Sequence, residues 1–128
     1  MTAAIVNITF DCADPYALAG FWARVTGLPL DTEARPGDDE VCLVPPPGRP
    51  GFLFIRVPEG KTAKNRIHLD LTQDTTRDAE VERIVALGGV IVQDHRRPDG
   101  SGWVYLGDPE GNEFCVELNT AERAALSR

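Results

Sequence analysis

The chain has 128 residues, 42% of them hydrophobic and 26% charged, which is typical of one globular domain with a substantial core. Its 13 Lys and Arg against 20 Asp and Glu give a formal net charge of −7. This acidic balance argues against nucleic acid or an anionic membrane as the main partner, because both attract a positively charged surface.

The cysteines and the apolar segments bear on location. Cys12, Cys42 and Cys115 are odd in number and widely spaced, which indicates reduced thiols. No apolar run approaches the roughly 20 residues of a membrane span. The N-terminus lacks the basic start and apolar core of a signal peptide. We therefore expect a cytoplasmic protein without a membrane partner.

The first half of the chain predicts a strand, a helix and three further strands. Alternating apolar side chains over residues 4–12 are typical of a strand with one buried face. Asp14 and Pro15 indicate a helix start, Leu18 begins an apolar stripe at helical spacing, and Gly27 predicts the helix end. The remaining strands are expected at residues 28–34, 40–44 and 52–57, followed by a linker at residues 58–61.

The second half repeats this order, beginning with a strand at residues 66–71. Thr75 and Asp78 resemble a capping box at the start of a helix, which Gly88 ends. The buried stripe of this helix is expected to consist of Val81, Ile84 and Val85. Three strands at residues 90–93, 103–106 and 113–118 and a short surface helix at residues 120–128 are expected to follow.

The two halves are related by an internal repeat. A constant offset of 61 residues relates Asn7 to His68 and Arg56 to Glu117. We interpret this as two fused copies of one module. The prediction is an α+β fold with two tandem βαβββ modules in one domain, residues 1–128: module 1 at about 4–58, module 2 at about 65–119 and a tail at 120–128. Joined edge to edge, the modules would form a curved eight-stranded mixed sheet around a cavity, with the helices outside.

Three segments of this pattern are similar to a known group of proteins. Residues 64–71, residues 106–114 and the helix of residues 14–27 with Leu28 resemble the vicinal oxygen chelate superfamily, and closely its glyoxalase-like domain subgroup. The superfamily includes glyoxalase I, bleomycin-resistance proteins and extradiol dioxygenases. The resemblance covers nearly the whole chain and implies the fold more strongly than the reaction, because this fold hosts several chemistries.

In the metalloenzymes of this group, the ligands come from the first and fourth strands of each module, which implies positions Asn7, Arg56, His68 and Glu117 here. His68 and Glu117 suit a divalent metal such as Zn, Ni, Fe or Mn. Arg56 only donates hydrogen bonds and cannot bind a cation. With two of the usual ligands left, the resemblance favours a protein without a cofactor. A divalent metal at His68 and Glu117 is the alternative.

Alternation along the strands predicts a cavity lining that mixes polar and aromatic side chains. The expected lining is Asn7, Thr9, Asp11, Phe52, Phe54, Arg56, His68, Asp70, Thr72, Glu113, Cys115 and Glu117, with Trp103 and Tyr105 as an aromatic wall. Such a lining suits a small amphipathic ligand. We interpret Asn7, Phe54, Arg56, Asp70, Trp103 and Tyr105 as substrate-binding residues, and His68 and Glu117 as the catalytic acid and base.

Several of these residues have a second interpretation. Phe52, Phe54 and Trp103 could equally belong to the core. Cys115 could act as a nucleophile, but a buried inert thiol is favoured. The basic run at residues 95–97 could meet an anionic group of a substrate, but a solvated surface run is favoured.

Three functions are open at this point. The favoured one is a glyoxalase-like protein that binds a small organic molecule in the cavity, with or without metal-independent catalysis. The second is a metal-dependent lyase or dioxygenase that uses His68 and Glu117. The third is a resistance protein of the bleomycin type that sequesters an aromatic cationic drug. A homodimer is expected, because the resemblance implies that such proteins often pair.

Overall fold

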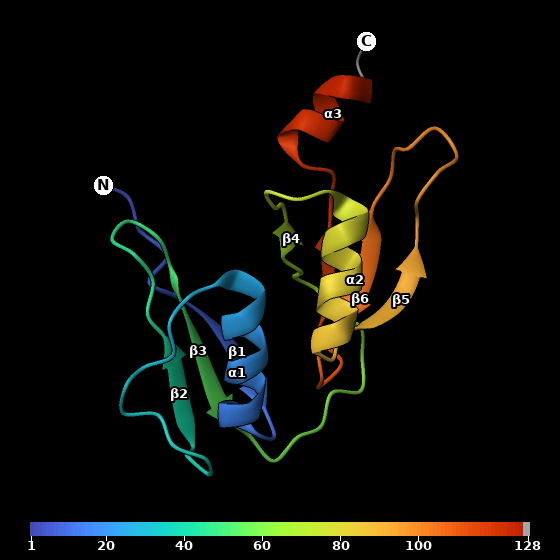
Figure 1. The fold of residues 1–128 in the computed structure, drawn as a ribbon. Coiled ribbons are helices and arrows are strands. Elements are labelled where there is room, and N and C mark those ends of the chain that lie inside the picture. The colour runs from blue at the N-terminus through green and yellow to red at the C-terminus, as the bar shows by residue number, and fades with distance from the viewer. Residues whose placement is uncertain (127–128) are drawn as a thin grey trace. The chain divides into compact units, whose positions relative to one another are not determined.

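The structure is a computed structural model that describes residues 1–126. The chain divides into two compact units, of which unit 1 spans Met1–Lys61 and unit 2 begins at Thr62. Each unit is a small sheet with a helix along one face (Figure 1). Within residues 1–126, no helix is long and apolar enough to cross a membrane.

Unit 1 contains three strands and one helix: β1 (Asn7–Cys12), α1 (Pro15–Thr26), β2 (Glu40–Leu43) and β3 (Gly51–Arg56). The strand order is β1-β3-β2, with β1 parallel and β2 antiparallel to β3. The Asp14 side chain accepts a hydrogen bond from the backbone N–H of Ala17, and Gly27 ends the helix at φ 75°. The predicted start and end of this helix are therefore confirmed.

An aromatic cluster forms the core of unit 1 on the face that α1 covers. The ring of Phe10 lies 5.0 Å from that of Phe54 and 5.3 Å from that of Trp22, between centroids. Trp22 and Phe54 are fully buried. Such aromatic packing stabilises the unit through its large buried apolar area.

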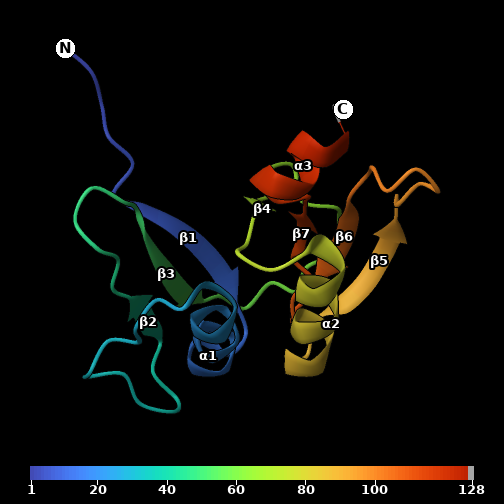
Figure 2. The same ribbon diagram turned by 45° about the horizontal axis from the view of Figure 1, so that its top comes forward.

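Unit 2 contains four strands and two helices: β4 (Asp70–Leu71), α2 (Arg77–Leu87), β5 (Val90–Asp94), β6 (Val104–Gly107), β7 (Glu113–Val116) and α3 (Thr120–Leu126). The strand order is β4-β7-β6-β5, with β4 parallel to β7 and the other pairs antiparallel. Figure 2 shows α2 lying along the sheet, with α3 near the end where α2 begins.

The strand count differs from the prediction. Residues 1–126 form seven strands in two hydrogen-bonded sheets, so the expected single sheet of eight strands is not confirmed. The segment predicted as a strand at residues 28–34 makes only one bridge, between Leu30 and Leu43. Pro29 has no N–H to donate, and the Asp31 carbonyl accepts a turn bond from Ala34, so pairing cannot continue.

Two details of the second helix also differ. Its N-cap is Thr76 instead of Thr75, because the Thr76 hydroxyl accepts the bond from the Ala79 N–H. Val85 is 43% exposed, whereas Arg77 and Glu80 are buried beside Val81 and Ile84. The buried stripe of α2 is therefore narrower and more polar than its apolar spacing predicts.

The packing of unit 1 predicts that the Phe54 side chain stabilises the folded state. Phe54→Ala should lower the free energy of unfolding by about 3–5 kcal/mol, because it leaves a cavity beside Phe10 and Trp22. Urea unfolding followed by circular dichroism measures this. Leu53→Ala on the other face, where the side chain is only half-buried, is the matched control and should cost less than half as much. Equal costs for both variants would contradict the assignment.

Candidate functional site

The sheet of unit 2 has one apolar and one polar face. Val104, Leu106, Phe114 and Val116 are fully buried on one face. Alternate residues of the same strands point the other way, because successive side chains of a strand alternate. That opposite face, called here the polar face, carries His68, Asp70, Trp103, Tyr105, Cys115 and Glu117.

The register of the strands sets the order of side chains on the polar face. Asp70 pairs with Cys115, Cys115 with Tyr105 and Tyr105 with Gln93, forming a central row. Glu117, directly after the end of β7, continues this register and lies level with Trp103, whose carbonyl accepts a bond from the His95 N–H. His68 lies on the other side of the central row, level with Glu113.

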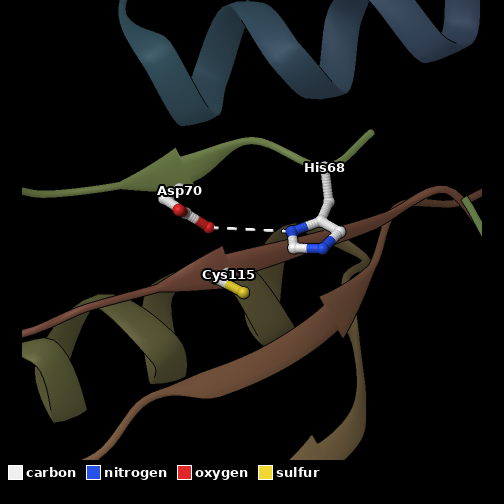
Figure 3. Close-up of side chains that lie close together, drawn as sticks. All are labelled: His68, Asp70 and Cys115. Atoms are coloured by element: carbon white, nitrogen blue, oxygen red, sulfur yellow. Dashed lines mark ion pairs between the residues drawn. The ribbon is translucent and has the colours of Figure 1, made fainter. Parts of the chain in front are cut away.

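His68 contacts two residues of the central row. Its Nε2 lies 3.1 Å from the Tyr105 hydroxyl, and its Nδ1 lies 3.7 Å from a carboxylate oxygen of Asp70 (Figure 3). The longer distance exceeds that of a hydrogen bond. Nδ1 is buried and has no hydrogen-bond partner among the described residues. The imidazole side chain keeps 30% exposure, so a ligand can reach it.

Burial governs the acidity of the neighbouring groups. It raises the pKa of the Cys115 thiol to about 11, and the hydrogen bond with Asp70 acts in the same direction. The pKa of Tyr105 is also raised, first by burial and then by the neighbouring Cys115 and Asp70. Both groups are therefore protonated at neutral pH. A protonated thiol is a poor nucleophile, which agrees with the prediction that Cys115 is a buried, inert thiol.

An aromatic and charged group lies at the far end of the polar face. The His95 ring stacks on Trp103 at 4.9 Å between centroids, and the Arg97 guanidinium lies 5.4 Å from the Trp103 centroid. Glu117 forms an ion pair with Arg123 of α3 at 3.5 Å. Trp103 is thus part of this surface and not of the apolar core.

The structure brings some predicted site residues together and separates others. His68, Asp70 and Tyr105 are in contact, and Trp103 and Glu117 share their face further along. Glu117 lies just beyond β7, four residues after Glu113, the residue level with His68. The donors grouped with His68 are instead Asp70 and Cys115, whose ligand atoms all lie within 4.8 Å of one another. A catalytic or metal role for Glu117 stays a prediction.

Two predicted site residues of unit 1 lie on the face of its sheet opposite to Asn7. Phe54 pairs with Phe10 on the α1 side, so its expected position beside Asn7 is wrong. Arg56 is level with Cys12 on the same side, where its Nε lies 3.1 Å from an Asp39 carboxylate oxygen and its Nη1 donates to the Ala13 carbonyl. Phe52 is also buried on this face, 5.7 Å from Phe10 between ring centroids.

The reason lies in a one-residue difference between the units. The β3 partner of Asn7 is Gly51, 44 positions further on. The β7 partner of Asp70 is Cys115, 45 positions further on. The constant offset of 61 residues therefore aligns β1 with the segment of His68 and Asp70 correctly, but it aligns β3 with β7 one residue out of register. A shift of one residue reverses the faces of a strand, so Arg56 lies on the face opposite to the expected one. Asn7 itself stays on the open face, beside Gly51.

The sequence does not indicate three of the contacts on the polar face. It places Cys115 in the lining but not as a partner of His68 and Asp70. Lys64 lies 5.2 Å from the Tyr105 ring centroid, and Arg123 reaches Glu117 from a helix expected to carry no chemistry. The turn at Asp108 could have indicated the first of these, because it fixes where β7 begins.

The two small sheets, each with a helix along one face, define an α+β protein of the glyoxalase-like fold class, a fold that solved structures share. Within that class, the chain belongs to the glyoxalase-like domain family, whose model it matches over residues 7–117. No curated protein matches the sequence significantly.

Solved structures share the fold at low sequence identity. A glyoxalase/bleomycin resistance protein/dioxygenase family enzyme from Burkholderia phytofirmans PsJN is 19% identical with a TM-score of 0.70, covering 89% of this chain and 97% of that chain. A lactoylglutathione lyase from Agrobacterium tumefaciens is 24% identical with a TM-score of 0.59, covering 91% and 93%. The fosfomycin resistance protein FosX from Listeria monocytogenes, complexed with Mn(II) and 1S,2S-dihydroxypropylphosphonic acid, is 17% identical with a TM-score of 0.68, covering 100% of both chains.

The donor set around His68 determines which metal it could take. An imidazole, a carboxylate and a thiol suit a borderline-soft cation such as Zn²⁺ better than Mn²⁺, which prefers oxygen ligands. The buried Nδ1 of His68 without a hydrogen-bond partner is consistent with a ligand there. His68, Asp70 and Cys115 thus fit a zinc-type ion, provided that the thiol loses its proton on binding.

The raised pKa of Cys115 predicts a loss of stability in alkaline solution. The thiol ionises near the ordinary cysteine pKa of 9.0 in the unfolded chain but near 11 in the folded one. Above the unfolded pKa the unfolded state therefore binds fewer protons, and stability falls with rising pH until the folded thiol also ionises. Between pH 8 and pH 10, the contribution of Cys115 should fall by about 1 kcal/mol.

Urea unfolding at both pH values measures this change. Cys115→Ala should show a smaller loss between pH 8 and pH 10 than the wild type, whatever its own stability. Cys42→Ala is the comparison variant, because burial, Asp31 and Glu40 raise the pKa of that thiol too, and it should keep the part of the loss that Cys115 contributes. An identical pH dependence of the wild type and Cys115→Ala would contradict the buried, protonated thiol.

Proposed function

We propose that this protein binds a small organic molecule against the polar face of unit 2. The observation that supports this most directly is the contact of the Tyr105 hydroxyl with His68 Nε2 on a face that α2 leaves open. Directed polar groups beside aromatic surface are what small-molecule sites commonly offer. Asp70 and Trp103 extend this surface on either side of Tyr105.

His68 and Tyr105 are assigned the central roles. The protonated Tyr105 hydroxyl donates to Nε2, which leaves the proton of the neutral imidazole on Nδ1, toward Asp70. Asp70 favours that tautomer electrostatically, and it stabilises the imidazolium once Nε2 takes a proton. A ligand that replaces the Tyr105 contact meets a base at Nε2 and a hydrogen-bond donor at the phenol.

The function in its favoured form needs no metal. A glyoxalase-like lyase or isomerase step consists of proton transfers beside a carbonyl group, and His68 is placed to accept such a proton. Asp70 stabilises the positive charge that develops on the imidazole during this transfer, and Tyr105 donates a hydrogen bond to the developing oxyanion. We assign the base to His68 in preference to Glu117, because Glu117 is paired with Arg123.

Binding can be measured through Trp103. In a Trp22→Phe background, Trp103 is the only tryptophan of the chain, and its fluorescence should change saturably with a ligand from a broad metabolite panel. His68→Ala and Tyr105→Phe should each weaken binding by at least 5-fold, because each removes one partner of the 3.1 Å contact. Tyr16→Phe, on α1 of unit 1, is the matched control and should leave binding unchanged. A panel without any saturating ligand would count against the proposal.

The metal-dependent alternative is favoured by one observation, the convergence of His68, Asp70 and Cys115. A bound Zn²⁺ would supply Lewis-acid chemistry at this point. Elemental analysis of protein purified without chelator should then find one equivalent of zinc, and Cys115→Ala and His68→Ala should each lose it. The affinity should rise with pH, because the Cys115 thiol must lose its proton.

A cobalt(II) titration gives a second readout of the same alternative. Coordination by Cys115 should produce a near-ultraviolet thiolate-to-metal absorption that is missing in Cys115→Ala. Substoichiometric zinc in the wild type, together with no such absorption, would leave the metal-free function in place. The expected pairing of two copies stays a prediction, which light scattering of the purified protein checks.

A further inference from the structure

A cavity of about 340 Å³ lies at the far end of the polar face. Its lining residues come from the loop before β6, from the segment directly after β7, and from α3: Arg97, Ser101, Gly102, Trp103, Glu117, Leu118, Arg123 and Leu126. The volume lies at the lower end of the range for small-molecule sites. The lining combines one indole, two leucines and two guanidinium groups.

Buried contacts hold the walls of this cavity in place. The buried Arg77 guanidinium donates to the carbonyls of Gly100, Ser101 and Gly102 at 3.2, 3.0 and 3.0 Å. Glu122 of α3 accepts a bond from the Arg77 backbone N–H at 2.8 Å, so the same residue fixes the helix on the opposite side. The cavity is therefore built by specific bonds and is not a gap beside a loose tail.

The charges in the lining favour an anion. The charged groups of the lining are Arg97, Arg123 and the carboxylate of Glu117, which lies 3.5 Å from Arg123. Asp99, outside the lining, accepts bonds from the Ser101 N–H and hydroxyl at 2.9 and 2.6 Å and also interacts electrostatically with Arg97. The lining thus has a net positive charge in a chain whose net charge is −7. A guanidinium group is well suited to carboxylate and phosphate oxygens.

From these observations we infer that the cavity is a subsite for the anionic end of a small organic acid, with a carboxylate or a phosphate held by Arg97 and Arg123. This inference rests on the proposed function and names the class of its ligand. The apolar body of the ligand lies along Trp103 and Leu118. Tyr105 is two residues from Trp103 on the same face, about 7 Å away along the strand, so the rest of a modest ligand reaches the Tyr105–His68 contact.

Four simple probes with one aromatic ring test the charge preference: benzoate, phenyl phosphate, benzyl alcohol and benzylamine. Each is titrated into the Trp22→Phe protein with Trp103 fluorescence as the readout. We expect benzoate or phenyl phosphate to saturate at least 10-fold more tightly than benzyl alcohol, and to weaken with added salt. The better of the two anions tells whether the subsite prefers a carboxylate or a phosphate.

Charge variants test the residues. Arg97→Gln and Arg123→Gln should each weaken binding of the preferred anion by at least 5-fold. Glu117→Gln should strengthen it severalfold, because it removes the competing carboxylate beside Arg123. Arg49→Gln, an exposed arginine of unit 1, changes the net charge equally and should have no effect. Circular dichroism confirms that each variant is folded.

The outcomes separate the subsite from the proposed function. Equal binding of benzyl alcohol, tighter binding of benzylamine, or no saturable binding of either anion would overturn the anionic subsite. Anion binding that Arg97→Gln and Arg123→Gln leave intact would also overturn it. In each of these cases, a ligand from the metabolite panel that depends on His68 and Tyr105 would still support the proposed function.

Discussion

Hydrogen-bonded register is the constraint on which the site depends. In unit 2 the pairing of Asp70 with Cys115, and of Cys115 with Tyr105, places one acid, one thiol and one phenol in a row. Since a shift by one residue turns every side chain of a strand to the other face, no other pairing brings these groups together. The apolar residues between them, buried on the opposite face, hold that register in place.

Arg77, the first residue of α2, holds the loop at the far end of the polar face in place. A positive charge at a helix N-terminus is unfavourable with the helix dipole, yet Arg77 is buried there. Its Nε donates to the Asp78 carboxylate at 2.9 Å, and this bond holds the pKa of Asp78 below its usual value. The same guanidinium donates to the carbonyls of Gly100, Ser101 and Gly102. The start of α2 therefore fixes the loop that carries Arg97.

How far the sequence predicts this structure depends on the range of the interaction. Local signals such as the Asp14 cap and the Gly27 end predict α1 correctly, because each acts within one helical turn. Alternation also predicts correctly that His68, Asp70 and Tyr105 share a face. The position of Arg56 depends on pairing with a strand more than forty residues away, and alternation within one strand carries no information on that pairing.

The remaining differences have the same physical origin. The side chain of Phe54 is as compatible with a core as with a binding surface, and only its stacking on Phe10 decides between them. Arg123 of α3 lies beside Glu117 because two bonds fix the position of this helix. Glu122 accepts a bond from the backbone N–H of Arg77, the first residue of α2, and the Asn119 side chain donates to the Thr75 carbonyl just before α2. Such contacts between distant segments leave no periodic signal in the sequence. The sequence of α3 therefore predicts only an ordinary surface helix.

The two units carry different chemistry on equivalent strands. Thr9 pairs with Leu53 in unit 1, as Asp70 pairs with Cys115 in unit 2. The central strand of unit 1 therefore presents an aliphatic side chain where that of unit 2 presents a thiol. Two positions on, Ile55 corresponds in the same way to Glu117. The donors and charges that we assign to binding thus come from the second copy. On its open face, the central strand of the first copy presents the aliphatic Leu53 and Ile55, so substitutions there should alter binding less than substitutions in unit 2.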